Sequence, residues 1–457
     1  MLPFDLPPPG DDQGVVYTKP WVVELMLDLA GYSSDADLVD ALAIEPAAGE
    51  GAFVVEMARR LIASCRARGR PISGCLRSLI AFEIDEAGAE AARSAVFRTL
   101  RASSVEAGQA RELATTWIRS GDFLLHAPTL PPADFVVGNP PYVRLEGVPA
   151  EATRAYRNSY PTMQGRADLY VGFIEAALRG LKPSGVCAYI CADRWMLNQY
   201  GAGLRHFITS AFNVETIIEM HDADPFASTV SAYPAITVIR AGAQGRVVVA
   251  TSGAPAGQVD ATRLALSLRP SPDGTGLRPL PPIASATVVE TWFEGDAPWP
   301  IRSPGRLALL RRLEEQFQTL EDGESTKVGI GVATGCDRVF ITKNADLVET
   351  SRMLPLAMAS DTSTGHLLWS GSHLVDPWGP EGLVALPNFP RLRAYLERHE
   401  SDLRARHTAK SSPASWYKTI DRVTHSLVAK PKLYIADIKD EFNPVLDRGE
   451  TYPHHNL

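Results

Sequence analysis

The chain lacks the features that mark membrane-embedded and exported proteins. No window approaches about 18 uncharged apolar residues, so no membrane span is expected. The first thirteen residues carry four prolines and three aspartates but have neither a basic start nor an apolar core, which argues against a signal peptide. We therefore interpret residues 1–14 as a flexible arm and expect a cytoplasmic protein.

Cysteine is sparse and unclustered. The five cysteines include no Cys-x-x-Cys pair, so the sequence predicts neither a zinc site nor a disulfide framework, and no metal is expected. Cys187 and Cys191 fall on one face of a predicted strand, where we expect a buried pair of free thiols.

Positive charge is not in excess either. A net charge of −8 has the wrong sign for a general nucleic-acid binder and argues against a histone-like protein, although it allows a cleft with a local basic lining. One candidate lining consists of Arg302, Arg306, Arg311 and Arg312. A solvated helix face is an equally good interpretation of these arginines.

The chain does have a regular alternation of strand-like and helix-like segments between residues 15 and 240. Strands are predicted at 38–44, 79–84, 116–120, 133–137, 186–191, 214–219 and 235–240. Helices are predicted at 51–68, 85–100, 168–181 and 201–211, the third capped by Asp168 and stopped by Lys182-Pro183-Ser184-Gly185. Such alternation predicts an open α/β sheet, mostly parallel, with helices on both faces.

The amino-acid composition changes after residue 240. Residues 241–304 are rich in Gly, Pro, Ser and Ala, which predicts a linker with a few weak strands. Beyond it a helix is predicted at 307–320, followed by short β-like runs at 328–330, 338–341 and 432–435. We therefore expect residues 305–457 to form a separate domain whose loop-rich surface is typical of recognition.

The most informative segment is Asn139-Pro140-Pro141-Tyr142, which follows the apolar run 134–138. The prolines fix φ and remove two N–H donors, so the turn is stiff. The Asn139 oxygen and the Pro140 carbonyl are acceptors for the two N–H bonds of a planar amine, and the Tyr142 ring can stack on the ring that bears this amine. A strand that ends in this tetrapeptide is suited to holding a conjugated NH2 group.

Small and acidic residues follow the first predicted strand. Gly49 and Gly51 let a ligand approach the backbone just before a helix N-terminus. Glu45 is more informative, because a carboxylate at this point repels a pyrophosphate but pairs with an amino group. S-adenosylmethionine carries such an amino group, whereas dinucleotides do not.

The next two strands also end in acids. The second strand ends in Glu83-Ile84-Asp85, where a carboxylate can accept hydrogen bonds from ribose hydroxyls. After the third strand, Asp122 can accept the amino group of an adenine and Phe123 can pack on its ring. Helix capping is an alternative for Asp85 and Asp122, and core packing is an alternative for Phe123. Four such features at four successive strand ends make coincidence improbable.

Taken in order, these motifs resemble the TaqI-like, gamma-order group of adenine-N6 DNA methyltransferases. The resemblance is carried by Tyr17-Thr18-Lys19-Pro20, Glu45-Pro46-Ala47-x-Gly49-x-Gly51, Glu83-Ile84-Asp85, Gly121-Asp122-Phe123 and Asn139-Pro140-Pro141-Tyr142. It covers residues 15–240 closely and continues more weakly through the glycine-rich segment 329–335, with Asp337 and Phe340.

The resemblance implies a class I methyltransferase with a Rossmann-like mixed sheet over residues 15–240 and an α+β DNA target-recognition domain over 305–457. It implies S-adenosylmethionine as cofactor and double-stranded DNA as partner, with a cognate restriction endonuclease or other defence-system proteins as further partners of a monomer. The cofactor-binding residues that it implies are Tyr17, Thr18, Glu45, Ala47, Gly49, Gly51, Glu83, Asp85, Asp122, Phe123, Asn139 and Pro141.

For catalysis the resemblance implies that Asn139 and Pro140 hold the target amine while Tyr142 stacks on a flipped-out adenine. Phe226 is the best match to a second aromatic wall, with a core phenylalanine as the alternative. Two departures stand out. The gap between Glu45 and Glu83 is long, which suggests an insertion, and the chain stops at Leu457, where the group's recognition domain continues. That domain is therefore either short or truncated in this sequence.

Three other activities fit parts of the pattern. A protein-glutamine methyltransferase also uses Asn-Pro-Pro-Tyr on a planar amide, but the large C-terminal domain and the Tyr-Thr-Lys-Pro segment argue against it. A guanine-N2 RNA methyltransferase often has Phe at the position of Tyr142. A bifunctional restriction enzyme would need a nuclease site, and no convincing one is present. A binding protein with an inactive cofactor site fits least well.

Overall fold

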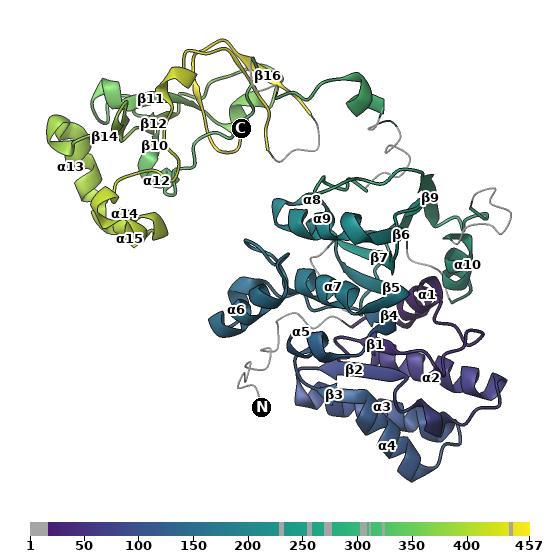
Figure 1. Ribbon diagram of the computed structural model, residues 1–457. Coiled ribbons are helices and arrows are strands. Elements are labelled where there is room, and N and C mark those ends of the chain that lie inside the picture. The colour runs from purple at the N-terminus through teal and green to yellow at the C-terminus, as the bar shows by residue number, and fades with distance from the viewer. Residues whose placement is uncertain are drawn as a thin grey trace. The chain divides into compact units, whose positions relative to one another are not determined.

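The structure is a computed structural model that describes residues 17–227, 233–253, 258–268, 277–301, 309, 312–321, 325–437 and 442–457 (Figure 1). The chain divides into two compact units, residues 1–316 and 317–457, which are treated separately below. The predicted arm at 1–14 lies outside the described residues, as do three of the four arginines of the candidate lining. Within the described ranges, no helix is both long enough and apolar enough to cross a membrane.

Unit 1 is built on a nine-stranded sheet with the order β3-β2-β1-β4-β5-β7-β6-β8-β9. Its strands are β1 (Ala43–Glu45), β2 (Leu79–Glu83), β3 (Ile118–Ser120), β4 (Ala133–Gly138), β5 (Leu181–Ala192), β6 (Phe212–Glu219), β7 (Pro234–Ala241), β8 (Val247–Ser252) and β9 (Ala284–Val289). The first five are mutually parallel, β7 runs antiparallel to β5 and β6, and β9 runs antiparallel to β8. The predicted α/β class with a mixed sheet is confirmed.

Two hydrophobic cores lie on the two faces of this sheet, and β5 shows how the sequence divides between them. Val186, Ala188 and Ile190 belong to one core, whereas Cys187, Tyr189 and Cys191 belong to the other, as the period of two in a strand requires. Both thiols are buried and free, as predicted.

Helices cover both faces of the sheet (Figure 1). One face carries α1 (Pro20–Ala30), α2 (Ala52–Ala67), α3 (Glu86–Ala102), α4 (Ala107–Trp117) and α10 (Gln258–Leu268). The other carries α5 (Phe123–His126), α6 (Ala150–Ser159), α7 (Leu169–Arg179), α8 (Arg194–Leu197) and α9 (Ala202–Ala211).

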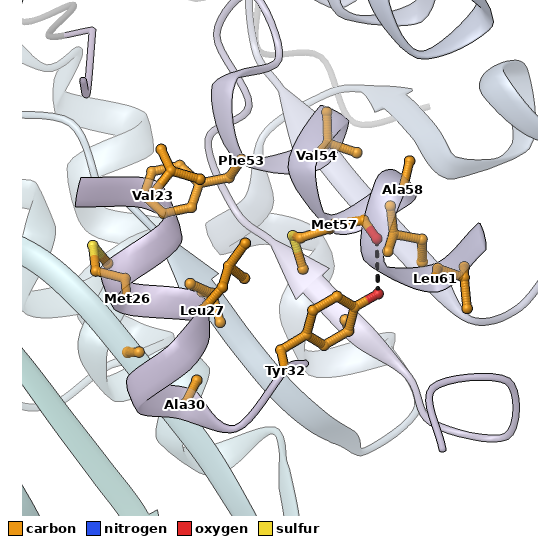
Figure 2. Close-up of a cluster of buried hydrophobic side chains, with 14 of the residues drawn as sticks. Val23, Met26, Leu27, Ala30, Tyr32, Phe53, Val54, Met57, Ala58 and Leu61 are labelled. Carbon is orange, nitrogen blue, oxygen red and sulfur yellow. Dashed lines mark hydrogen bonds between the residues drawn. The ribbon is translucent and has the colours of Figure 1, made fainter. Parts of the chain in front are cut away.

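The first core joins α1, which was not predicted, to α2 (Figure 2). Pro20 stands at the first helical position of α1, where its missing N–H is not needed. Figure 2 shows Leu27 of α1 and Met57 of α2 directed into one cluster, with Tyr32 just beyond the end of α1. The buried Tyr32 hydroxyl donates to the Met57 carbonyl oxygen at 3.3 Å and so fixes the loop that leads to β1.

Three predictions of local structure in unit 1 are corrected. β1 begins at Ala43 rather than at residue 38. α7 ends at Arg179, and the Lys-Pro-Ser-Gly segment expected to follow it instead opens β5. A side chain at Gly185 would meet the Ala133 carbonyl oxygen at 2.8 Å, so a glycine is required where β5 enters beside β4. Asp168 stands before α7, but its carboxylate accepts from the Tyr170 hydroxyl rather than from a backbone N–H.

The predicted linker at 241–304 is also wrong, because β8, α10 and β9 complete unit 1. β8 pairs in parallel with β6, and the Val247–Val249 stretch is buried. Farther on, the buried Trp299 packs against Trp195, and its backbone N–H donates to the Met196 carbonyl oxygen. The helix predicted at 307–320 is helical at 312–316 and not at 317–320, while several of its first residues lie outside the described ranges.

Unit 2 has a four-stranded sheet with the order β10-β12-β11-β17, two two-stranded ribbons and a core of its own. Its strands are β10 (Ile341–Thr342), β11 (Met353–Ala357), β12 (His373–Val375), β13 (Trp378–Gly379), β14 (Gly382–Leu383), β15 (Lys432–Tyr434), β16 (Val445–Asp447) and β17 (Tyr452–Pro453). Its α-helices are α12 (Asp337–Phe340), α13 (Pro390–Arg398), α14 (Glu400–Ala405) and α15 (His407–Ser411). The expected α+β composition is confirmed.

Of the three short strands predicted in unit 2, only the one at 432–435 is present, as β15. Residues 328–330 form no strand, and the run at 338–341 lies mostly in α12. The glycine-rich segment pairs instead with the final residues of the chain, through a parallel bridge between Val332 and His454. Gly331 permits this approach, since a Cβ there would lie 2.3 Å from the His454 carbonyl oxygen.

Candidate functional site

A cavity of about 460 Å³ opens at the edge of the sheet where the parallel strands β1, β2, β3 and β4 end. This size lies within the usual range of about 300–1,000 Å³ for small-molecule sites. The predicted site residues that line the cavity are Tyr17, Thr18, Glu45, Ala47, Gly49, Glu83, Asp85, Asp122, Phe123, Asn139, Pro140, Pro141 and Tyr142. Gly51 and Phe226 are not among the lining residues.

Glu83 links the loops that follow three neighbouring strands. Its two carboxylate oxygens accept the backbone N–H of Gly49 at 2.7 Å and that of Asp85 at 3.0 Å. Its backbone carbonyl accepts the N–H of Gly121 at 2.8 Å. The loops after β1, β2 and β3 are therefore fixed to one another, and the floor of the cavity is preorganised.

The two glycines of the first loop have different surroundings. Gly49 has a φ of +51° and space where a Cβ would lie, next to the cavity. Gly51 has a φ of +103°, and a Cβ there would touch the Ala92 backbone of α3 at 3.3 Å. Gly51 thus allows α2 to pack against α3, so a glycine is needed at this position whether or not a ligand binds.

Glu45 is a carboxyl group buried inside the cavity wall, with 1% of its surface exposed. Burial raises its pKa well above the usual range, and the backbone N–H groups of Val54 and Phe53 offset this only in part. Within the described residues, neither Glu45 oxygen has a hydrogen-bond partner at standard geometry. A buried acid of this kind is ionised when a cationic group binds beside it.

The acids after β2 and β3 also cap helices. Asp85 accepts the N–H of Gly88 at 2.8 Å at the start of α3, and Asp122 accepts that of Leu124 at 2.8 Å at the start of α5. The capping interpretation therefore holds for both, although both still line the cavity. Burial raises the pKa of Asp122 despite a hydrogen bond from the Tyr156 hydroxyl. Phe123 is likewise both a core residue and a lining residue, packed against Phe82 and Phe173.

The tetrapeptide closes the cavity at the end of β4. The Asn139 amide nitrogen donates to the Thr18 hydroxyl at 3.2 Å, which holds the amide beside the N-terminal motif. Thr18 is itself held by pairing of the backbone around it with the segment after β6: the Lys19 N–H donates to the Pro225 carbonyl oxygen, and the Ala227 N–H donates to that of Tyr17. The N-terminal motif and the tetrapeptide are thus brought into one site.

Aromatic side chains surround Tyr142. Its ring lies edge-on to Phe226, with centroids 6.0 Å apart, and edge-on to Tyr170, with centroids 6.4 Å apart. Tyr170 is held in place by hydrogen bonds to Asp168 and Tyr200. Phe226 is 4% exposed and belongs to the first core, so in this arrangement it packs against Tyr142 rather than facing it across an open slot.

Comparisons with known proteins identify relatives that match the segment around this site and the chain as a whole. A model of the family described as Eco57I restriction-modification methylase matches residues 133–226, which include the tetrapeptide. The type II methyltransferase M.PaeR7I of Pseudomonas aeruginosa is 41% identical over 97% of this chain and 77% of its own length. M.XhoI of Xanthomonas vasicola is 39% identical over 98% of this chain and 82% of its own.

The chain belongs to this family of type II DNA methyltransferases. The fold agrees with that of the type IIL restriction-modification enzyme MmeI, solved in complex with DNA, at a TM-score of 0.55 and 11% identity over 96% of this chain and 59% of that one. The expected class I methyltransferase fold is therefore confirmed, and the methyltransferase uses S-adenosylmethionine.

The cavity of the methyltransferase suits this cofactor. The cofactor carries an ammonium group, ribose hydroxyls and an adenine amino group, all of which donate hydrogen bonds. The cavity provides acceptors for these donors, namely the buried Glu45 and the carboxylates of Glu83, Asp85 and Asp122. Within the described residues, no group of three or more His, Cys, Asp or Glu side chains is placed to hold a metal ion.

Sequence reasoning missed part of the lining. Val148, Pro149 and Tyr156 come from α6 and the turn before it, and Leu169 and Phe173 come from α7. α6 was not predicted, because of its ten residues only Ala152 and Tyr156 are buried. The spacing of Tyr156 and Tyr160 by four residues was the one available signal of a helix face.

Proposed function

We propose that the protein methylates the exocyclic N6 of a flipped-out adenine in double-stranded DNA, as the modification enzyme paired with a restriction endonuclease. The observation that carries this proposal is the position of Asn139. Its amide lies in the same cavity as the cofactor-facing acids and is oriented by Thr18. The target amine and the methyl group of the cofactor can therefore be brought together in one cavity.

The residues of the cavity are assigned along the strand ends. Glu45 and Thr18 hold the methionyl part, Glu83 and Asp85 hold the ribose, and Asp122 and Phe123 hold the adenine. Tyr17, Ala47, Gly49 and Pro141 complete the walls. When bound, S-adenosylmethionine supplies a methyl group already activated on a sulfonium, so the protein contributes chiefly positioning.

The target amine is a poor nucleophile because its lone pair is delocalised into the ring. The Asn139 oxygen and the Pro140 carbonyl accept its two N–H bonds off the ring plane and so localise that pair on nitrogen. They also stabilise the positive charge that develops there, each bond contributing roughly 1.5–3 kcal/mol in the transition state. No strong base is needed, and the tetrapeptide contains none.

A base inside a duplex cannot reach this cavity, so it is flipped out at a cost of a few kcal/mol. Stacking on Tyr142 offsets about 1–3 kcal/mol of that cost. For Phe226 to form the opposite wall, its ring must leave its present edge-on contact with Tyr142. Unit 2 is proposed to recognise the DNA sequence.

The test is substrate competition. The full chain is incubated with tritiated S-adenosylmethionine and equal masses of duplex DNA, RNA and protein. Label in DNA alone supports the proposal, whereas label in protein or RNA would favour a glutamine or guanine-N2 methyltransferase and overturn it. Asn139→Ala is compared with Asn213→Ala, whose side chain bonds to Gln244 and Gly245 and lies outside the cavity lining. Only the first substitution is expected to lower the rate of transfer strongly.

A further inference from the structure

Asp122 is held by a tyrosine that no sequence motif singled out. The Tyr156 hydroxyl, from α6, donates to Asp122 Oδ2, while Asp122 Oδ1 accepts the Leu124 N–H at 2.8 Å. Tyr156 is 2% exposed, and both Tyr156 and Asp122 line the cavity. The pair therefore forms one wall of the cofactor cavity, at the end of β3, rather than part of the outer surface.

The Tyr156–Asp122 pair presents hydrogen-bond acceptors to the cavity and keeps its one O–H donor within the pair. Burial, followed by the nearby Asp122 charge, raises the pKa of Tyr156, so its phenol keeps its proton. A phenol has a single O–H, which Tyr156 gives to Asp122, and its oxygen is left as an acceptor. A carboxylate offers only acceptors as well. This wall therefore favours a ligand that brings N–H donors, because a carbonyl oxygen in the same place could gain a hydrogen bond only by taking the Tyr156 O–H away from Asp122.

We propose that Tyr156 is a specificity-determining residue of the cofactor pocket, whose oxygen accepts one N–H of the adenine amino group while Asp122 accepts the other. This inference rests on the proposed placement of the adenine beside Asp122. A primary amine satisfies both acceptors at once, which a purine with a carbonyl at that position cannot do. The pair thus selects the aminopurine form of the cofactor.

A matched control tyrosine lies at the C-terminal end of the same helix. Tyr160 directly follows α6, is also 2% exposed, and donates from its hydroxyl to the Leu124 carbonyl oxygen at 2.7 Å. Both tyrosines thus tie α6 to α5, but Tyr160 does not line the cavity. Removing the Tyr160 hydroxyl reproduces the structural loss of a buried tyrosine hydrogen bond without touching the ligand wall.

The experiment measures equilibrium binding of two ligands to the full-length wild-type protein, Tyr156→Phe and Tyr160→Phe. The ligands are S-adenosylhomocysteine and S-inosylhomocysteine, in which a carbonyl oxygen replaces the amino group. Tyr156→Phe is expected to weaken binding of the adenosyl ligand about five- to tenfold, the contribution of one hydrogen bond. Its binding of the inosyl ligand should be unchanged or tighter, so the preference for the amine falls. Tyr160→Phe should leave that preference as in the wild type.

Three outcomes would overturn the inference. Equal weakening of both ligands by Tyr156→Phe would mean that the hydroxyl only supports the fold. An unchanged preference in Tyr156→Phe, together with loss of adenosyl binding in Asp122→Asn, would reject Tyr156 while preserving the proposed adenine site. If Asp122→Asn also binds the adenosyl ligand like the wild type, the proposed placement of the cofactor fails together with the inference.

Discussion

The two units of the protein differ in how their strands deliver side chains to one place. In unit 1 the parallel strands β1, β2, β3 and β4 all end at one edge, so residues just after four separate strands line a single cavity. In unit 2 the pairs of β12 with β10 and β11 are antiparallel, so consecutive strand ends point in opposite directions. Strand-end motifs can therefore be interpreted in unit 1 without knowing the fold in detail, whereas in unit 2 they cannot.

The most severe test of this comparison is the loss of the tetrapeptide amide. Asn139→Ala should lower the rate of methyl transfer about 10- to 150-fold, because it removes one acceptor that contributes roughly 1.5–3 kcal/mol in the transition state. Binding of S-adenosylhomocysteine should change little. Single-turnover transfer to duplex DNA measures the rate, and calorimetry measures the binding. A parallel loss of cofactor binding would mean that Asn139 serves the cofactor rather than the target amine.

A second test asks whether unit 2 fails independently of unit 1. Gly331→Ala places a Cβ against backbone atoms of Pro453 and His454, so the free energy of unfolding of unit 2 should fall by about 1–3 kcal/mol. Methylation of DNA should fall with it, while the affinity for S-adenosylhomocysteine stays the same. Gly329→Ala is the control, since no atom lies within 4 Å of its Cβ position. Weakened ligand binding in Gly331→Ala alone would contradict the independence of the two units.

A third test uses the buried acid of unit 1. Because burial raises the pKa of Glu45, its contribution to stability is present below its usual value of 4.5 and is lost as pH rises through the raised value. Glu45→Gln should therefore become more stable than the wild type as pH rises.

The same substitution should weaken S-adenosylhomocysteine binding about tenfold or more, because the ammonium group loses its carboxylate partner. Wild-type affinity should rise with pH as Glu45 gives up its proton, while that of Glu45→Gln should stay flat. Thermal unfolding and calorimetry at several pH values measure both trends. A wild-type affinity that is independent of pH would place the ammonium group elsewhere.

The smallest expected effect separates the ring of Tyr142 from its hydroxyl. The buried hydroxyl has no hydrogen-bond partner among the described residues, so Tyr142→Phe should change the methylation rate less than about twofold. Tyr142→Ala should lose the stacking contribution of about 1–3 kcal/mol. Fluorescence of 2-aminopurine at the target position reports how much of the base is flipped out. A large defect in Tyr142→Phe would assign the hydroxyl a role in catalysis.

The sequence predicted the part of the site in which chemistry and chain order coincide. Glu45 and Glu83 end their strands, Asp122 and Asn139 come just after theirs, and all four line the cavity. Tyr156 was missed because α6 is a mostly polar helix in which only Ala152 and Tyr156 are buried, too few for a clear apolar face. Its importance depends on a contact with Asp122, 34 residues earlier, that no local pattern encodes.

The predicted linker failed for a different reason. Its glycines and prolines cluster between the strands, so average composition concealed β8, a short strand whose Val247–Val249 stretch is buried. For Phe226 the sequence left two interpretations open, a second aromatic wall or a core residue, and the packing against the first core could be decided only from the structure. Local pattern predicts where elements end, whereas tertiary packing decides which side chains face the cavity.

The central claim concerns the atom that receives the methyl group. Duplex DNA methylated with deuterium-labelled S-adenosylmethionine is digested to nucleosides and separated by mass spectrometry against standards. The account predicts that the label appears in N6-methyldeoxyadenosine and that Asn139→Ala slows its appearance strongly. Label in N4-methyldeoxycytidine or 5-methyldeoxycytidine, with none in adenine, would contradict it.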